Sequence, residues 1–234
     1  MRALVSRAIQ YAYRELLPGF EAASGVAVDT VWSSTGAIVE QIASDAPFDL
    51  VIAGAATIDR FIADGAVLAG SRVDQMSSGI GVAVKAGAPR PDIGSGEAVK
   101  HALLAAQSIG YSQGPSGVYL LALFEKMGIA KQIRAKATQS TPGIPVAHYL
   151  AAGTVALGFQ QVSELIDKTG IALVGPLPAD IQKITMFASG VPNRSTAPDA
   201  ARALQTYLSS PASDAAIRKH GMEPGRRRLP PFER

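Results

Sequence analysis

The chain has 234 residues, of which 47% are hydrophobic and 18% charged, and its formal net charge is +3. This composition can bury a sizeable core and is unlike that of a disordered chain. The absence of cysteine excludes disulfides, thiolate metal sites and cysteine nucleophiles. Aromatic residues make up only 6% of the chain, too few for a base-stacking surface. We therefore expect no nucleic-acid partner.

The N-terminal segment bears on the cellular location of the protein. Residues 1–5 run directly into the polar pair Ser6 and Arg7, unlike the long apolar core of a signal peptide. No apolar stretch reaches the roughly 20 residues that a membrane span needs, so no membrane insertion is expected. The sequence as it stands predicts a cytoplasmic protein, or a periplasmic one if a leader has been removed.

Strand and helix patterns alternate along the chain, which is typical of parallel sheets flanked by helices. The predicted strands, in chain order, are 2–5, 26–32, 49–53, 80–84, 108–111, 155–160, 171–175 and 182–189. The predicted helices are 9–20, 37–42, 58–64, 97–106, 118–127, 144–152, 197–209 and 212–220. Pro18 is expected to kink or restart the first helix.

The composition shifts twice, near residues 79–90 and near residues 180–193. No long linker separates the elements, so the chain is expected to cross between two lobes at these points. We assign residues 1–80 and 190–234 to lobe one and residues 81–189 to lobe two. The predicted fold class is α/β, with two lobes of mixed or parallel sheets and flanking helices.

Four segments share one pattern, in which a strand ends, small or polar residues follow, and a helix begins. They are residues 5–9, 32–37, 111–117 and 159–163. In open parallel sheets, ligands bind beyond the carboxyl ends of the strands. The first N–H groups of a helix are unpaired and carry a partial positive charge, which suits an anion. The pattern therefore predicts a small anion held in the cleft between the lobes.

The candidate ligand-binding residues at these four breaks are Ser6, Arg7, Ala8, Ser33, Ser34, Thr35, Gly36, Ser112, Ser116, Gly117, Gln160 and Gln161. Hydroxyls donate hydrogen bonds without bulk, and glycines let the backbone approach closely. The alternative is that each break only caps its helix, since Ser and Thr are favoured there in any case. None of the breaks matches a phosphate-loop motif.

Several of these segments resemble the molybdate-binding branch of the type II periplasmic binding proteins. The resemblance covers nearly the whole chain and is carried by residues 33–37, 41–42, 46–52, 114–119, 158–161 and Gly221. It implies the two-lobed fold and an anion held by hydroxyls and backbone amides at the helix starts. By position, these groups fall near Ala8, residues 34–36, Gly117 and Gln161.

Three departures from the family pattern bear on the ligand. The family usually has a serine where this chain has Ala8, and a tyrosine where it has Gln161. Arg7 stands beside the site, where a molybdate binder has neutral groups. Because a guanidinium matches a carboxylate with two parallel hydrogen bonds, these departures favour a small carboxylate over a metal oxyanion.

This subgroup is also similar to aconitate isomerases, which implies an alternative function. An isomerase that moves a proton along a tricarboxylate needs a base and donors for the developing enolate. The candidate bases are His148, Tyr111 and Glu164, each of which also has a purely structural explanation. The three histidines are far apart in sequence, so no metal site is predicted, and no cofactor is expected. Two functions stay open: a receptor that delivers an anion to an ABC transporter permease, and a cytoplasmic isomerase acting on a small tricarboxylate.

Overall fold

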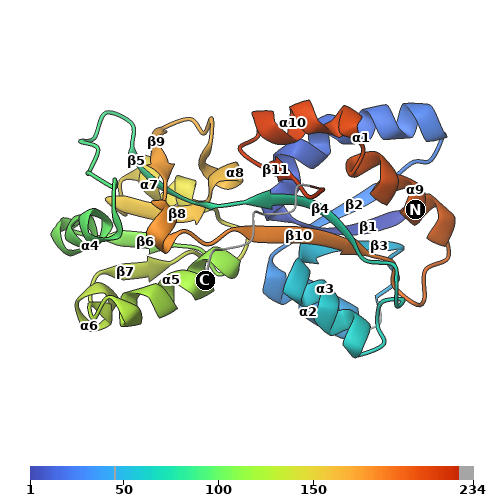
Figure 1. Ribbon diagram of the computed structural model, residues 1–234, viewed down its shortest axis with the longest axis horizontal. Helices are drawn as coiled ribbons and strands as arrows, with labels where there is room; N and C mark the ends of the chain where they lie inside the picture. The colour runs from blue at the N-terminus through green and yellow to red at the C-terminus, as the bar shows by residue number, and fades with distance from the viewer. Residues whose placement is uncertain (45, 227–234) are drawn as a thin grey trace. The chain divides into compact units, whose positions relative to one another are not determined.

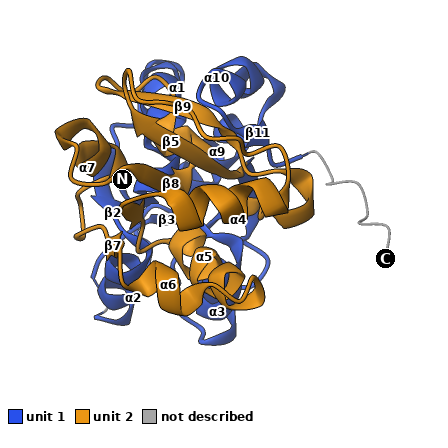
Figure 2. Ribbon diagram, turned by 90° about the vertical axis from the view of Figure 1, so that its left-hand side faces the viewer, with its two compact units in different colours: residues 1–77, 186–234 blue, residues 78–185 orange. Residues whose placement is uncertain are grey.

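The computed structural model describes residues 1–44 and 46–226, and the chain divides into two compact units. Unit 1 comprises Met1–Ser77 and Met186–Arg234, and unit 2 comprises Ser78–Thr185 (Figure 2). The chain thus passes from unit 1 into unit 2 and back once. Each unit has its own sheet and its own buried side chains, and each is described by itself.

Unit 1 is built on a mixed sheet with the strand order β11-β4-β10-β3-β1-β2. The central strand β1 is parallel to β2 and to β3, whereas β10 is antiparallel to β3. The strands are β1 (Arg2–Ser6), β2 (Asp29–Ser33), β3 (Leu50–Gly54), β4 (Val73–Ser78), β10 (Thr185–Gly190) and β11 (Glu223–Pro224). Because β1 is buried between two parallel neighbours, Ala3, Leu4 and Val5 present apolar side chains to both faces of the sheet.

Helices cover both faces of the unit 1 sheet (Figure 1). One face packs against α1 (Gln10–Ser24), α9 (Pro198–Leu208) and α10 (Asp214–Lys219), through a cluster that includes Tyr13, Phe20 and Leu204. The other face packs against α2 (Thr35–Ala43) and α3 (Ala55–Ala63), through Ile38, Ile58 and Phe61. The short helices η1 (Arg7–Ile9) and η3 (Pro211–Ser213) precede α1 and α10.

Unit 2 is built on a second mixed sheet, with the strand order β7-β6-β8-β5-β9. Strand β6 is parallel to β7 and β8, whereas β5 is antiparallel to β8 and β9. The strands are β5 (Ile80–Lys85), β6 (Ile109–Tyr111), β7 (Ala137–Gln139), β8 (Leu157–Gln161) and β9 (Ile171–Pro176). The two mixed sheets with flanking helices confirm the predicted fold class.

The helices of unit 2 also lie on both faces of its sheet. On one face α4 (Gly96–Ala105), α5 (Pro115–Lys126) and α6 (Ala130–Arg134) enclose a core that contains Leu103, Phe124 and Ile133. On the other face α7 (Val146–Ala152) and α8 (Val162–Leu165) contribute Val146, Leu150 and Leu165. A single helical turn, η2 (Ala179–Ile181), follows β9.

Several elements differ from the sequence expectations. The first helix runs through Pro18 without a break to Ser24, and Gly25 closes it, as the sequence predicts, with a φ of 70° that glycine adopts easily. Strands β4, β7 and β11 and helices α6 and α8 were not predicted. The chain crosses between the units after Ser77 and after Thr185. Among the described residues, no helix combines the length and hydropathy needed to cross a membrane.

Candidate anion site at the strand ends

The first two predicted breaks lie side by side at one edge of the unit 1 sheet. Strands β1 and β2 are parallel, and their last residues, Ser6 and Ser33, are directly paired. Ser6 is buried, and its hydroxyl oxygen accepts a hydrogen bond from the Ala8 N–H at 3.4 Å. The register therefore brings residues from two breaks that are far apart in sequence to the same edge.

Ser33 and Ser34 use their hydroxyl oxygens to hold α2. Gln41 donates from Nε2 to the Ser33 oxygen at 2.9 Å, and the Ala37 N–H donates to the Ser34 oxygen at 3.4 Å. In both bonds the serine is the acceptor, so its own hydroxyl hydrogen is not consumed. Thr35 and Gly36 form the first turn of α2, where backbone N–H groups lack helical partners. Capping and anion binding are therefore compatible at this helix start.

Arg7 follows Ser6 and lies in η1 with an exposed side chain. Within residues 1–44 and 46–226, its guanidinium forms no hydrogen bond or ion pair with the protein. An arginine without a protein carboxylate keeps all five of its N–H donors for another partner. Arg7 thus places a positive charge immediately beyond the carboxyl end of β1.

A further helix start on this edge was missed by the sequence reasoning. Strand β3 is parallel to β1 and ends at Gly54, which directly precedes α3. No side chain caps this helix, because Gly54 has none to offer. This start lacks the hydroxyl residues that mark the other breaks, although a glycine between an apolar strand and a helix is itself a signal.

The third and fourth breaks meet at one edge of the unit 2 sheet. Strands β6 and β8 are parallel, and Tyr111 on β6 is paired with Phe159 on β8. Ser112 follows Tyr111 and Gln160 follows Phe159, so the two residues lie next to this pair at the same edge of the sheet. Strand β7 ends at the same edge, where the Ser140 N–H donates to the Tyr111 carbonyl at 2.8 Å. The structure thus brings the candidates of these two breaks together.

The third break is built around a pair of buried serines. The Ser112 and Ser116 hydroxyls lie 2.8 Å apart, and Ser112 also accepts from the Gly114 N–H at 3.2 Å. Whichever serine donates to the other, one hydroxyl hydrogen is left. The bend also requires Gly117, because a Cβ there would collide with the Ser112 carbonyl oxygen. Glycine therefore allows α5 to begin immediately against the end of β6.

The two glutamines of the fourth break are held by protein contacts. Gln160 accepts from the Val146 N–H at 2.9 Å and donates from Nε2 to Glu164 at 2.7 Å. Gln161 donates from Nε2 to the Thr185 hydroxyl at 2.9 Å. Both side chains are almost completely buried, at 5% and 1% exposure. These contacts order the end of β8, and a ligand role for either glutamine stays a prediction.

The three candidate bases differ in their surroundings. His148 is exposed on α7 and meets the Tyr149 ring edge-on. Tyr111 ends β6, with its ring beside Gly117. Glu164 is partly buried in α8 and receives the hydrogen bond from Gln160. In the part of the chain that the structure describes, no cluster of His, Asp and Glu side chains could hold a metal ion.

The profile of a family described as bacterial extracellular solute-binding protein matches residues 1–223. The chain belongs to this solute-binding protein family. An aconitate isomerase from Pseudomonas sp. is 39% identical to it, in an alignment that covers 96% of this chain and 87% of that protein. This relative is far more similar in sequence than the solved structures described next.

Solved structures of a molybdate-binding and a sulfate-binding protein share the fold of this solute-binding protein. The periplasmic molybdate-binding protein of Azotobacter vinelandii matches with a TM-score of 0.79 and 18% identity, over 98% of this chain and 99% of that one. A sulfate-binding protein of Mycobacterium tuberculosis matches with a TM-score of 0.75 and 17% identity, over 96% and 86%. At these identities the likeness establishes the fold alone.

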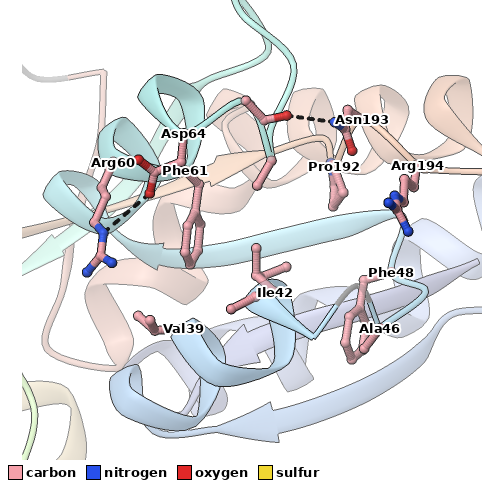
Figure 3. Close-up of a pocket in the computed structure, with 13 residues that line it drawn as sticks. Val39, Ile42, Ala46, Phe48, Arg60, Phe61, Asp64, Pro192, Asn193 and Arg194 are labelled. Carbon is pink, nitrogen blue, oxygen red and sulfur yellow. Dashed lines mark hydrogen bonds and ion pairs between the residues drawn. The ribbon is translucent and has the colours of Figure 1, made fainter.

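A cavity of about 350 Å³ within unit 1 lies away from the predicted site (Figure 3). It is lined by apolar side chains from the C-terminal part of α2 and from α3, among them Ile42 and Phe61. At its edge Arg60 is paired with Asp64 at 3.4 Å. Arg60 and Arg194 add positive charge to this lining, whereas the C-terminal end of α2 carries a partial negative charge. The cavity is therefore distinct from the helix start at Ser34, at the other end of α2.

Proposed function

We propose that this solute-binding protein is an isomerase that binds a small tricarboxylate of the aconitate class and interconverts its cis and trans forms. The observation that carries the proposal is the 39% identity to an aconitate isomerase across 96% of the chain. The donors at the strand ends of both units support it. Neutral N–H and O–H groups hold an anion, and Arg7 adds the positive charge that a polycarboxylate favours.

In this proposal, Arg7 is the residue that favours a carboxylate ligand over a metal oxyanion. Its side chain is exposed, and its planar guanidinium can donate two parallel hydrogen bonds to one carboxylate. The neighbouring Ala8 contributes no hydroxyl. Residues 5–9 therefore offer an anion the positive charge of Arg7 and backbone N–H groups, in place of a second hydroxyl beside that of Ser6.

The proposed reaction needs only proton transfer. A base takes a proton from the methylene carbon of aconitate, and the electron pair of the broken C–H bond spreads over the adjacent double bond and carboxylates. Rotation becomes possible where the double bond has been weakened, and the proton then returns to the other end of the allylic system. Hydrogen-bond donors stabilise the negative charge that develops on the carboxylate oxygens. His148, Tyr111 and Glu164 are the candidate bases.

The decisive experiment is to incubate the protein with trans-aconitate in heavy water and to follow it by proton NMR. We expect cis-aconitate to appear together with deuterium at the exchanging carbons. Arg7→Ala should weaken aconitate binding by about 2 kcal/mol, roughly 30-fold in Kd. Arg90→Ala removes another exposed arginine, in the turn that follows β5, and serves as the matched control. Equal binding by Arg7→Ala and the wild-type protein would remove Arg7 from the site.

A receptor without catalytic activity is the second candidate function. It is favoured by the family itself, whose description is that of an extracellular solute-binding protein. In this case an ABC transporter permease would be the partner, and the protein would act outside the cytoplasm. Tight binding of aconitate or citrate, with neither conversion between cis- and trans-aconitate nor deuterium exchange, would support the receptor. Thermal stabilisation by molybdate or sulfate alone would contradict the carboxylate ligand in either function.

A further inference from the structure

We infer that Glu164 is the base of the proposed isomerisation and that Gln160 is the residue that positions its carboxylate. The inference rests on the proposed function and assigns roles within the unit 2 site. It is carried by the hydrogen-bonded chain from the Val146 N–H, through the Gln160 side chain, to the Glu164 carboxylate.

The orientation of the Gln160 amide follows from its partners. The Val146 N–H can only donate, so the oxygen of the Gln160 amide must face it, as the 2.9 Å contact shows. The NH₂ group then points the other way, and it donates to Glu164 Oε1 at 2.7 Å. An ionised carboxylate only accepts hydrogen bonds, so the two groups are complementary. Glu164 is thus held by a donor whose own direction is fixed by the backbone.

Burial makes this arrangement rigid. Gln160 is only 5% exposed, so water cannot easily replace either of its hydrogen bonds. Its position on β8 places it beside the β6 end, where the Ser112 and Ser116 hydroxyls lie. The carboxylate therefore lies at the same edge of the unit 2 sheet as the proposed anion donors.

The other two candidate bases lack such an arrangement. In the described part of the chain, Glu164 is the one candidate that a buried side chain holds by a hydrogen bond. His148 contacts a neighbouring ring only by its edge, and Tyr111 is hydrogen-bonded through its backbone carbonyl. A base must be held within reach of the proton that it removes, so a fixed carboxylate suits the role better.

In the reaction, the Glu164 carboxylate forms an O–H bond with the proton of the methylene carbon, and the C–H electron pair passes into the allylic system. Glu164 then returns the proton to the carbon at the far end of that system. The residue ends in its starting state, and nothing is oxidised or reduced. Gln160 touches no reacting atom and acts through the orientation of Glu164.

The test compares Glu164→Gln and Gln160→Glu with the wild-type protein in the deuterium-exchange assay. Glu164→Gln retains an acceptor for the Gln160 NH₂ group but removes the base. We expect its kcat to fall by about 100-fold or more, while aconitate still raises its Tm. The Gln160→Glu variant keeps an oxygen that can accept from the Val146 N–H, but it loses the NH₂ group that donates to Glu164. We expect kcat to fall with little change in KM.

The double variant Gln160→Glu, Glu164→Gln separates positioning from folding. It restores a donor–acceptor pair between the two positions, so its Tm should return toward that of the wild type while kcat stays low. Tyr111→Phe and His148→Gln test the competing bases and should retain exchange. Full activity of Glu164→Gln would overturn the role of the base, and an unchanged kcat in Gln160→Glu would overturn the positioning role. Failure of the wild-type protein to convert trans-aconitate into cis-aconitate would instead remove the proposed isomerase itself, and this inference with it.

Discussion

Asp49 shows how single side chains hold together parts of unit 1 that are distant in sequence. One carboxylate oxygen accepts from the Arg2 N–H at 2.8 Å, and the other accepts from the Thr196 and Ala197 N–H groups at 2.9 and 3.0 Å. Helix α9 has no cap from its own N-cap side chain, so Asp49 provides one from the start of β3. The residues next to α9 in the sequence cannot reveal this cap, because Asp49 is distant from the helix along the chain.

Asp49→Asn should destabilise the protein by about 1–3 kcal/mol at neutral pH, because the amide cannot accept on both sides. Burial raises the pKa of Asp49, but the hydrogen bonds from Arg2, Ser195, Ala197 and Thr196 outweigh it and hold the pKa below its usual value. A lowered pKa means that this stabilisation is present above the unfolded-state pKa of about 3.9 and is lost as the pH falls through the folded-state pKa.

Urea unfolding of Asp49→Asn and the wild-type protein at pH 7 and pH 3 tests this expectation. The difference in unfolding free energy should be large at pH 7 and should shrink at pH 3. Asp199→Asn is the matched control, because it removes a fully exposed aspartate from the first turn of the same helix. An equal loss in the control would mean that helix charge, and not the Asp49 hydrogen bonds, sets the stability.

The same reasoning explains which parts of the candidate site the sequence could predict. Hydroxyl residues between a strand and a helix are visible locally, so the helix starts at Ser34 and Ser116 could be predicted. The partners of Gln160 and Gln161 could not, since Val146 and Thr185 meet them only through the fold. Polar residues at a strand end look like ligand groups until the contacts that engage them are known.

At the level of elements, alternating strand and helix patterns predicted most of the structure, and the failure at β4 has a physical cause. Strand β4 was missed because its sequence Val-Asp-Gln-Met-Ser-Ser looks polar, although Gln75 and Ser77 are buried. The Gln75 side chain donates to the Ser189 hydroxyl at 2.7 Å, within a buried polar network. Hydrophobic periodicity cannot detect a strand whose buried side chains are polar.

The start of α5 provides a prediction about an element. Gly117→Ala should destabilise the protein by about 1–3 kcal/mol, because its Cβ would collide with the Ser112 carbonyl oxygen and displace the backbone. The same shift would move the Ser112 and Ser116 hydroxyls and weaken aconitate binding. Chemical denaturation and a thermal-shift titration measure the two effects.

Gly36→Ala is the matched control for this substitution, because it also replaces a glycine near a helix start. A Cβ at Gly36 would meet nothing within 4 Å, and the residue lies inside α2. Its stability should therefore be unchanged or higher by up to about 1 kcal/mol. If Gly117→Ala proved as stable as Gly36→Ala, the close approach of Ser112 to α5 would not constrain this position.

At the scale of the whole molecule, the two units differ in how the chain builds them. Unit 2 is one continuous segment, and the buried residues of its two core clusters all lie within it. Its ends are tied together by Gln182, which accepts from the Ile80 N–H at 2.8 Å and donates to the Leu177 carbonyl at 3.1 Å. Unit 1 instead needs two segments, because Phe187 and Leu204 complete the core around β1.

This difference predicts the behaviour of fragments. Residues 78–185 expressed alone should fold and unfold cooperatively in urea, as followed by circular dichroism, because they contain a complete sheet and its covering helices. Residues 1–77 alone should not, because β10 and α9 are missing, and adding residues 186–234 should restore structure. The only tryptophan, Trp32, lies in unit 1, so its fluorescence follows that recovery. A non-cooperative transition for residues 78–185 would show that unit 2 depends on unit 1 for its stability.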